Sequence, residues 1–131
     1  MTPPEVTPAA IARALDGLRH HQPMRARNFS VHGAAWSDAR GNIVLSREDV
    51  GRHSALDKLI GAMSRAGVDK TDGFVVLSSR CGFELVQKAT AVGIGLLASV
   101  SAPTTMALSM ARQAGMSLAV SAQGHAVVVL E

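Results

Sequence analysis

Two continuous apolar segments, GFVVLSS at 73–79 and IGLLASV at 94–100, constrain the fold of this chain more than any other feature. Small residues flank both segments, and an unbroken apolar run of this kind is typical of a strand that is buried on both faces. The stretch between them, 82–93, has the apolar spacing of a helix and ends at a glycine. Because strand–helix–strand connections are almost always right-handed, these segments are expected to be parallel central strands of a sheet.

The segments on either side add helices and a hairpin to this unit. Apolar residues at helical spacing after Pro8 predict a short amphipathic helix with Thr7 as its N-cap. Short apolar segments at 31–36 and 42–46, separated by the turn-rich SDARG, predict a β-hairpin. Further helices are expected over 54–67 and 103–115, and further strands over 116–122 and 125–131.

The composition is that of a globular chain with an aliphatic core. Of the 131 residues 47% are hydrophobic and 18% are charged, the opposite of the composition of disordered chains. We expect a lead-in with a short helix over 1–22 and a single globular domain over 23–131. The order of elements predicts an α/β fold in which helices cover both faces of a mixed sheet with parallel central strands.

Composition also argues against several classes of protein. Aromatic residues make up 3% of the chain and tyrosine is absent, so the stacking platforms of single-strand nucleic-acid binders are missing. No segment resembles a signal peptide, and no uninterrupted apolar stretch of about 18 residues could span a membrane. The single cysteine, Cys81, excludes an internal disulfide. We therefore expect a soluble, cytoplasmic protein that binds neither nucleic acid nor membranes. Its net charge of +3 fits either a solvated basic face or an anion-attracting patch.

Three segments follow strands at the edge where open parallel sheets bind their ligands. They are SREDVGRH at 46–53, SSRCG at 78–82 and SVSAPTT at 99–105. Each supplies small residues whose backbone N–H groups can approach a ligand, and two supply an arginine, Arg52 and Arg80. Helix N-termini attract anions, so these segments together predict a phosphorylated ligand. No P-loop or G-x-G-x-x-G pattern is present, so ordinary nucleotide and dinucleotide chemistry gains no support from a motif.

Single side chains in the first of these segments allow more than one interpretation. Glu48 and Asp49 fit a cap of the following helix and the organisation of Arg52 better than acid–base catalysis. Arg52 could clamp a phosphate with two hydrogen bonds or pair with Glu48. His53 could be a ligand contact or a local structural donor. Two further charges, Asp57 and Lys58, are expected on the helix surface.

Cys81 and two histidines are candidates for other chemistry. Cys81 at a helix start would have a lowered thiol pKa and be reactive, although a lone cysteine is usually a small buried hydrophobic residue. A zinc site from His32, His53 and Cys81 lacks any paired ligand spacing, so no metal site is expected. His32 fits a core histidine better than a ligand.

Four segments in a fixed order are more specific than any one of them. VHGAAW, REDVGRHSALDKLIG, VVLSSRCGFELVQKATAVGI and ASVSAPTTMAL follow one another between about Pro23 and Gly124. This part of the chain resembles the C-terminal domain of the formate dehydrogenase accessory sulfurtransferase family (FdhD).

The resemblance implies a cytidine-deaminase-like three-layer α/β/α sandwich without deaminase zinc chemistry. Members of the family carry sulfur from a cysteine desulfurase to the molybdenum bis(molybdopterin guanine dinucleotide) cofactor before its insertion into formate dehydrogenase. They bind the guanine dinucleotide part of the cofactor, which GDP mimics, and tend to form homodimers. Carried over to the three segments and the C-terminus, the resemblance predicts a cofactor site formed by Arg52, His53, Ser79, Arg80, Ser101, Thr104 and Gly124.

Two departures from the family pattern affect this prediction. The sulfur-carrying C-x-x-C motif lies upstream of this domain in the family and has no counterpart before Pro23, so the chain is either a fragment or a truncated member. Cys81 stands where the family usually has a small residue and does not inherit the carrier role, so no catalytic residue is assigned. The C-terminal GHAVVVLE keeps Gly124 but lacks the aromatic residue often found there.

A metal-dependent hydrolase and a ligand-free dimerisation domain remain the alternative functions.

Overall fold

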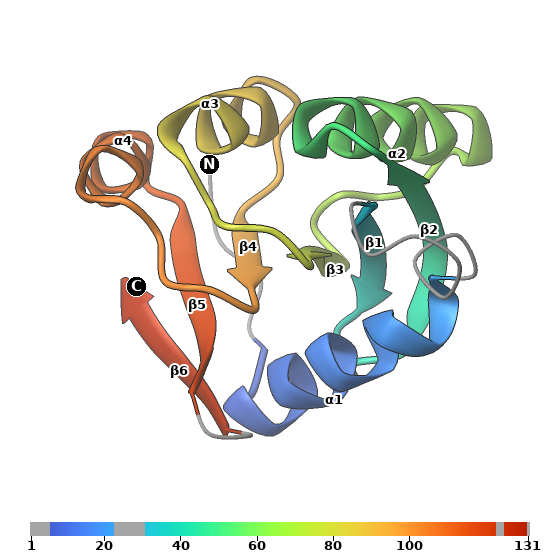
Figure 1. Ribbon diagram of the computed structural model, residues 1–131, viewed down its shortest axis with the longest axis horizontal. Coiled ribbons are helices and arrows are strands. Elements are labelled where there is room, and N and C mark those ends of the chain that lie inside the picture. Colours follow the sequence, from blue (N-terminus) through green and yellow to red (C-terminus); the bar gives the residue numbers. More distant parts are fainter. Residues whose placement is uncertain (1–5, 23–30, 123–124, 131) are drawn as a thin grey trace.

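A six-stranded mixed sheet with the strand order β2-β1-β3-β4-β5-β6 lies at the centre of the molecule. The computed structural model describes residues 6–22, 31–122 and 125–130 (Figure 1). Strands β3, β4 and β5 are parallel, whereas β1 is antiparallel to β2 and β3, and β6 is antiparallel to β5. The strands are β1 (His32–Asp38), β2 (Ile43–Asp49), β3 (Gly73–Leu77), β4 (Leu96–Ser99), β5 (Ser117–Ala122) and β6 (His125–Leu130). The mixed sheet with parallel central strands is therefore confirmed.

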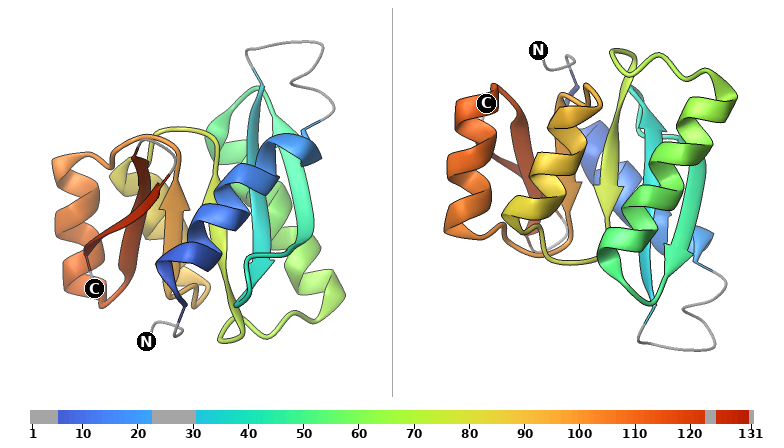
Figure 2. Two further views of the ribbon diagram at one scale, coloured as in Figure 1. Left: turned by 90° about the horizontal axis from the view of Figure 1, so that it is seen from below. Right: turned by 90° about the horizontal axis from the view of Figure 1, so that it is seen from above.

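Helices cover both faces of this sheet, as predicted, and complete a three-layer sandwich. Figure 2 shows α2, α3 and α4 side by side on one face and α1 crossing the other. The helices are α1 (Pro8–Leu18), the short 3₁₀ helix η1 (Arg19–His21), α2 (Arg52–Ala66), α3 (Phe83–Ala91) and α4 (Thr105–Ala114). Within the described residues, none of these helices is long and apolar enough to span a membrane.

Local sequence signals set the ends of these helices. The Thr7 hydroxyl accepts a hydrogen bond from the Ala10 N–H at 3.1 Å, so Thr7 caps α1 as predicted. Gly67 and Gly115 end α2 and α4 in the left-handed conformation, with φ of 66° and 73°. This conformation strains residues that have a Cβ, which explains why glycine stands at both ends.

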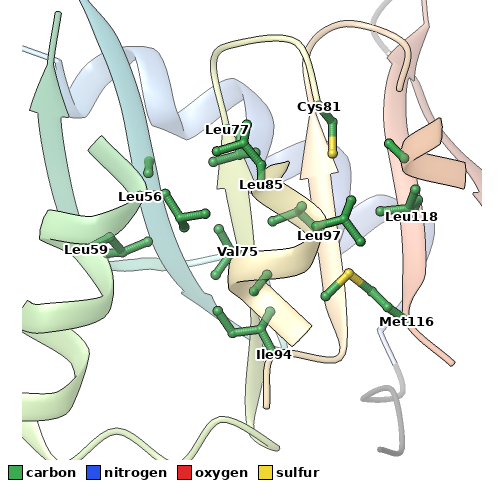
Figure 3. Packing of buried hydrophobic residues seen from close by; sticks show 14 of the residues in the cluster. Leu56, Leu59, Val75, Leu77, Cys81, Leu85, Ile94, Leu97, Met116 and Leu118 are labelled. Atoms are coloured by element: carbon green, nitrogen blue, oxygen red, sulfur yellow. The ribbon is translucent and has the colours of Figure 1, made fainter. Parts of the chain in front are cut away.

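Two apolar clusters fill the spaces between the three layers. The larger cluster lies under α2, α3 and α4, and Figure 3 shows Leu56, Val75, Leu85 and Leu97 packed within it. The smaller cluster joins α1 to the opposite face of the sheet through Ile11 and other residues. Although a lead-in over 1–22 was predicted to precede the domain, α1 thus forms one of the domain's three layers.

Candidate functional site

The sheet brings three connections to one edge of the molecule, at the carboxyl ends of β3 and β4. We call residues 49–53, 78–82 and 100–106 the carboxyl rim; it lies along the lower edge of the right-hand view in Figure 2. The Val100 N–H donates to the Leu77 carbonyl and the Thr104 N–H donates to the Cys81 carbonyl, both at 3.1 Å. These two bonds hold the β4–α4 connection against the segment that follows β3. The rim contains six predicted site residues: Arg52, His53, Ser79, Arg80, Ser101 and Thr104.

Asp49 organises the entrance to α2. Its carboxylate accepts a hydrogen bond from the Gly51 N–H at 3.0 Å and forms an ion pair with Lys58 Nζ at 2.7 Å. The hydrogen bond from Lys58 is the largest of the effects that hold the pKa of Asp49 below its ordinary value. Lys58 is exposed on the surface of α2, as predicted, and it also donates to the Glu48 carbonyl oxygen at 3.0 Å, so it connects α2 to the end of β2.

Glu48 does not share this role. It lies opposite Gly33 in the β1–β2 register, on the face of the sheet that α1 covers, and is buried. Neighbouring residues of a strand point to opposite faces, so Glu48 and Asp49 diverge. The expectation that both acids organise Arg52 and the start of α2 therefore holds only for Asp49 and only for the helix start.

Two contacts between polar side chains join α2 to α3. His53 Nε2 lies 3.5 Å from Glu84 Oε2, and Lys88 Nζ lies 3.1 Å from Asp57 Oδ1 one helical turn further along. Asp57 is exposed on the surface of α2, as predicted, and also pairs with α3. Sequence reasoning missed Glu84 and Lys88, because their pairs span 31 positions and no local pattern reports them.

Helices α2 and α3 begin without a side-chain cap. Gly51 and Gly82 occupy their N-cap positions, so the first backbone N–H groups at each helix start lack a side-chain acceptor. The α4 start differs, because Thr104 Oγ1 accepts a hydrogen bond from the Ala107 N–H at 3.1 Å. The rim thus offers unpaired donors and positive dipole ends at α2 and α3, and a satisfied helix start at α4.

The two predicted arginines lie beside the uncapped starts. Arg52 is the first residue of α2, Arg80 precedes α3, and both are exposed. Within the described residues neither guanidinium has a hydrogen bond or an ion pair. An unpaired guanidinium can bind a phosphate with two parallel hydrogen bonds.

The hydroxyls of Ser79 and Thr104 form hydrogen bonds within the protein, whereas Ser101 is bonded through its backbone carbonyl. Ser79 Oγ donates to the Arg80 carbonyl at 3.2 Å, and Ser99 Oγ donates to the Ser101 carbonyl at 2.6 Å. Ser79 can therefore offer a ligand only its lone pairs, while the Thr104 hydroxyl keeps its proton for a ligand because it accepts the cap bond. Gly124, the remaining predicted residue, lies outside the described residues.

Cys81 is a core residue, so the interpretation as a small buried hydrophobic residue is confirmed and the alternative of a reactive thiol is wrong. Its side chain is 1% exposed, and Figure 3 shows its Sγ pointing into the larger apolar cluster. Burial raises the pKa of this thiol to about 12. Since α3 begins at Phe83 with Gly82 as its N-cap, Cys81 lies outside the helix, and desolvation is what raises the pKa of its thiol.

In the part of the chain that the structure describes, no three histidine, cysteine, aspartate or glutamate side chains gather as a metal site would require. His53 instead pairs with Glu84, and Cys81 lies in the core. His32 begins β1, and its Nδ1 is buried without a hydrogen-bond partner. The described structure therefore does not bring His32, His53 and Cys81 together as metal ligands.

Comparison with known proteins agrees with the resemblance seen in the sequence. The model of the FdhD/NarQ family matches residues 1–131. The chain belongs to the FdhD/NarQ family. Proteins described as sulfur carrier protein FdhD are 52% identical over 120 residues in Xanthomonas oryzae and 50% identical over 108 residues in Bordetella parapertussis. These alignments cover 92% and 82% of this chain but 43% and 39% of the relatives, so the chain spans less than half the length of these FdhD proteins.

A solved structure shows the same fold. It is a crystal structure described as a formate dehydrogenase accessory protein from Desulfotalea psychrophila, with a TM-score of 0.88 and 24% sequence identity. The match covers 100% of this chain and 57% of that protein. The three-layer sandwich is thus a fold that this FdhD/NarQ chain shares with a protein of low sequence identity.

Proposed function

We propose that this chain is the cofactor-binding domain of a sulfur carrier that serves formate dehydrogenase. In this proposal the molybdenum bis(molybdopterin guanine dinucleotide) cofactor is the substrate, and its guanine dinucleotide part binds at the carboxyl rim. The observation that carries the proposal is the pairing of two uncapped helix starts with two unpaired arginines, Arg52 and Arg80, in a member of the FdhD/NarQ family.

The phosphates of a nucleotide fit this set of groups. Backbone N–H groups at the starts of α2 and α3 would donate to phosphate oxygens, and the two helix dipoles favour the negative charge. Arg52 and Arg80 would add charge-assisted hydrogen bonds. Lys58 and Asp49 hold the start of α2 in place, so this part of the site is organised before a ligand arrives.

In sulfur transfer, the role of this chain would be to hold the cofactor that accepts the sulfur. Its one cysteine is buried, with a pKa raised to about 12, and is unsuited to carrying a persulfide. The proposal assigns the thiol that carries the persulfide to a segment outside this sequence. A cysteine desulfurase would donate the sulfur, and formate dehydrogenase would receive the finished cofactor. It places this reaction in the cytoplasm and in a homodimer.

Calorimetric titration with GDP, a partial mimic of the cofactor, tests the proposal. Wild-type protein should bind GDP, and a ligand at 100 times its Kd should stabilise the fold by about 2.7 kcal/mol. The double variant Arg52→Ala/Arg80→Ala should bind at least about tenfold more weakly, because each charge-assisted hydrogen bond contributes about 1.5–3 kcal/mol.

Arg65 and Arg112 offer a matched control for this experiment. Both are exposed and lie in the last turns of α2 and α4, at the opposite ends of those helices from the rim. Arg65→Ala/Arg112→Ala removes the same net charge and should leave GDP binding unchanged. Equal losses in both double variants would mean that net charge alone attracts GDP, and no binding by the wild type would refute the proposed function.

A further inference from the structure

Strand β2 forms one outer edge of the sheet (Figure 1). Every second residue of an edge strand points its backbone N–H and C=O groups away from the sheet, and these groups can pair with a strand of another molecule. Whether β2 can accept such a strand depends on which of its residues point outward and on what already occupies their carbonyl groups.

The hydrogen bonds of β1 identify the outward residues of β2. The Gly33 N–H donates to Ser78 Oγ at 2.7 Å, and the Gly33 carbonyl accepts from the Ser78 N–H at 3.0 Å. The backbone groups of Gly33 therefore point toward β3, and those of Glu48, its partner on β2, point away from β1. Because this direction alternates along a strand, Ser46 also points its backbone groups outward.

Cationic side chains of the same chain occupy both of these outward carbonyls. Lys58 Nζ donates to the Glu48 carbonyl at 3.0 Å, and Arg47 Nη1 donates to the Ser46 carbonyl at 2.6 Å. Hydrogen bonds from charged donors are stronger than those from a backbone N–H, so an incoming strand would have to displace better donors than its own. Lys58 reaches the edge from α2, and its ion pair with Asp49 holds it there.

A β-bulge interrupts the same edge. Leu45 pairs with Trp36 and Ile43 pairs with Ser37, so Val44 is an extra residue of β2 without a partner on β1. Bulges bend and twist a strand, and proteins use bulges and charged side chains to prevent strands from adding to an edge. Val44 is 56% exposed, so an open edge here would present an apolar side chain beside free carbonyl groups.

We propose that Arg47 and Lys58 close the β2 edge to strand addition by a second copy of this chain. Without them, two β2 strands could pair in antiparallel fashion about a two-fold axis, because each copy would present the same outward groups. Closure of this edge does not depend on the ligand proposed at the carboxyl rim. Partners of the chain, a second copy included, would then bind through surfaces other than the β2 edge.

Sedimentation velocity at increasing protein concentration tests the closure of the edge. Arg47→Met/Lys58→Met keeps two long side chains and removes both donors. This double variant should self-associate beyond the wild-type species with an association constant at least about tenfold higher, because pairing no longer breaks charge-assisted hydrogen bonds. Association equal to that of the wild type would refute the proposal.

Two controls separate edge pairing from a general effect of charge. Arg65→Met/Arg112→Met makes the same change at exposed positions in the last turns of α2 and α4 and should behave like the wild type. Ser46→Pro, added to Arg47→Met/Lys58→Met, should restore wild-type behaviour, because proline removes an outward N–H and no bond to β1. Equal association in the first control, or association that persists with the proline, would also overturn the proposal.

Circular dichroism should show that these variants are folded. If the double variant does not fold, Arg47→Met alone frees the Ser46 carbonyl and leaves the contacts of Lys58 in place. It should still associate more strongly than the wild type, and no increase would then refute the proposal. Any association through the other edge strand, β6, is common to all variants and cancels in the comparison.

Discussion

The burial of Cys81 predicts that its thiol is almost inert in the folded protein. With a pKa of about 12, roughly one thiol in ten thousand is ionised at pH 8, whereas about one in four is ionised for an unperturbed cysteine of pKa near 8.5. Because the thiolate is the nucleophile, ionisation alone should slow alkylation by roughly two thousandfold or more. The packing that leaves the side chain 1% exposed should slow it further.

Iodoacetamide labelling at pH 8, followed by intact mass, measures this rate in native buffer and in denaturant. A native rate within about tenfold of the denatured rate would refute the assignment of Cys81 to the core, since local opening of a well-packed site exposes it rarely. The control is Ser109→Cys in a Cys81→Ala background, which places one thiol at an exposed position of α4 and should react fast in both conditions. The Cys81→Ala protein itself should still bind GDP.

Three further predictions concern the frame of the site. Gly73→Ala should destabilise the fold by more than about 2 kcal/mol in urea unfolding, because a Cβ there would overlap the Ser37 carbonyl oxygen, whereas Gly82→Ala, with open space around it, should change stability by less than about 1 kcal/mol. Equal effects would contradict the β1–β3 packing. Thr104→Ala should cost about 1 kcal/mol, visible as a lower Tm, because α4 loses its cap; an unchanged Tm would argue against that cap. The pKa of Asp49 is lowered chiefly by its lysine partner on α2. This carboxylate therefore stabilises the fold fully above its unfolded pKa of about 3.9, and the effect is lost as the pH falls from there through the lower pKa of the folded state. Lys58→Met should therefore make stability fall less steeply between pH 6 and 3, and an identical slope would count against the pair.

Much of the frame follows from local sequence. The apolar runs at 73–79 and 94–100 predict the central parallel strands, and Gly67 and Gly115 predict helix ends, because these signals act over a few residues. The rule that ligands bind beyond the carboxyl ends of parallel strands also places Arg52 and Arg80 on one edge.

The details of the site depend on contacts between distant segments. The burial of Cys81 depends on how the segment after β3 packs over the core, where the Cys81 carbonyl accepts a hydrogen bond from the Thr104 N–H. No local sequence pattern reveals this packing. The divergence of Glu48 from Asp49 depends on the register with β1, since a shift of one residue would exchange their faces. The role of α1 as a third layer likewise depends on the apolar face that the sheet leaves open to it.

The reversed direction of β1 has a consequence for how the chain is held together. It lets the hairpin end at the same edge as β3 and β4, so the rim joins residues 49–53 to residues 100–106 across about half of the sequence. A ligand that touches both ends of this span would act as a removable crosslink, present only in the folded chain. Hydrogen exchange should then slow across the hairpin and the α4 region together when ligand binds, and not only at the residues in contact.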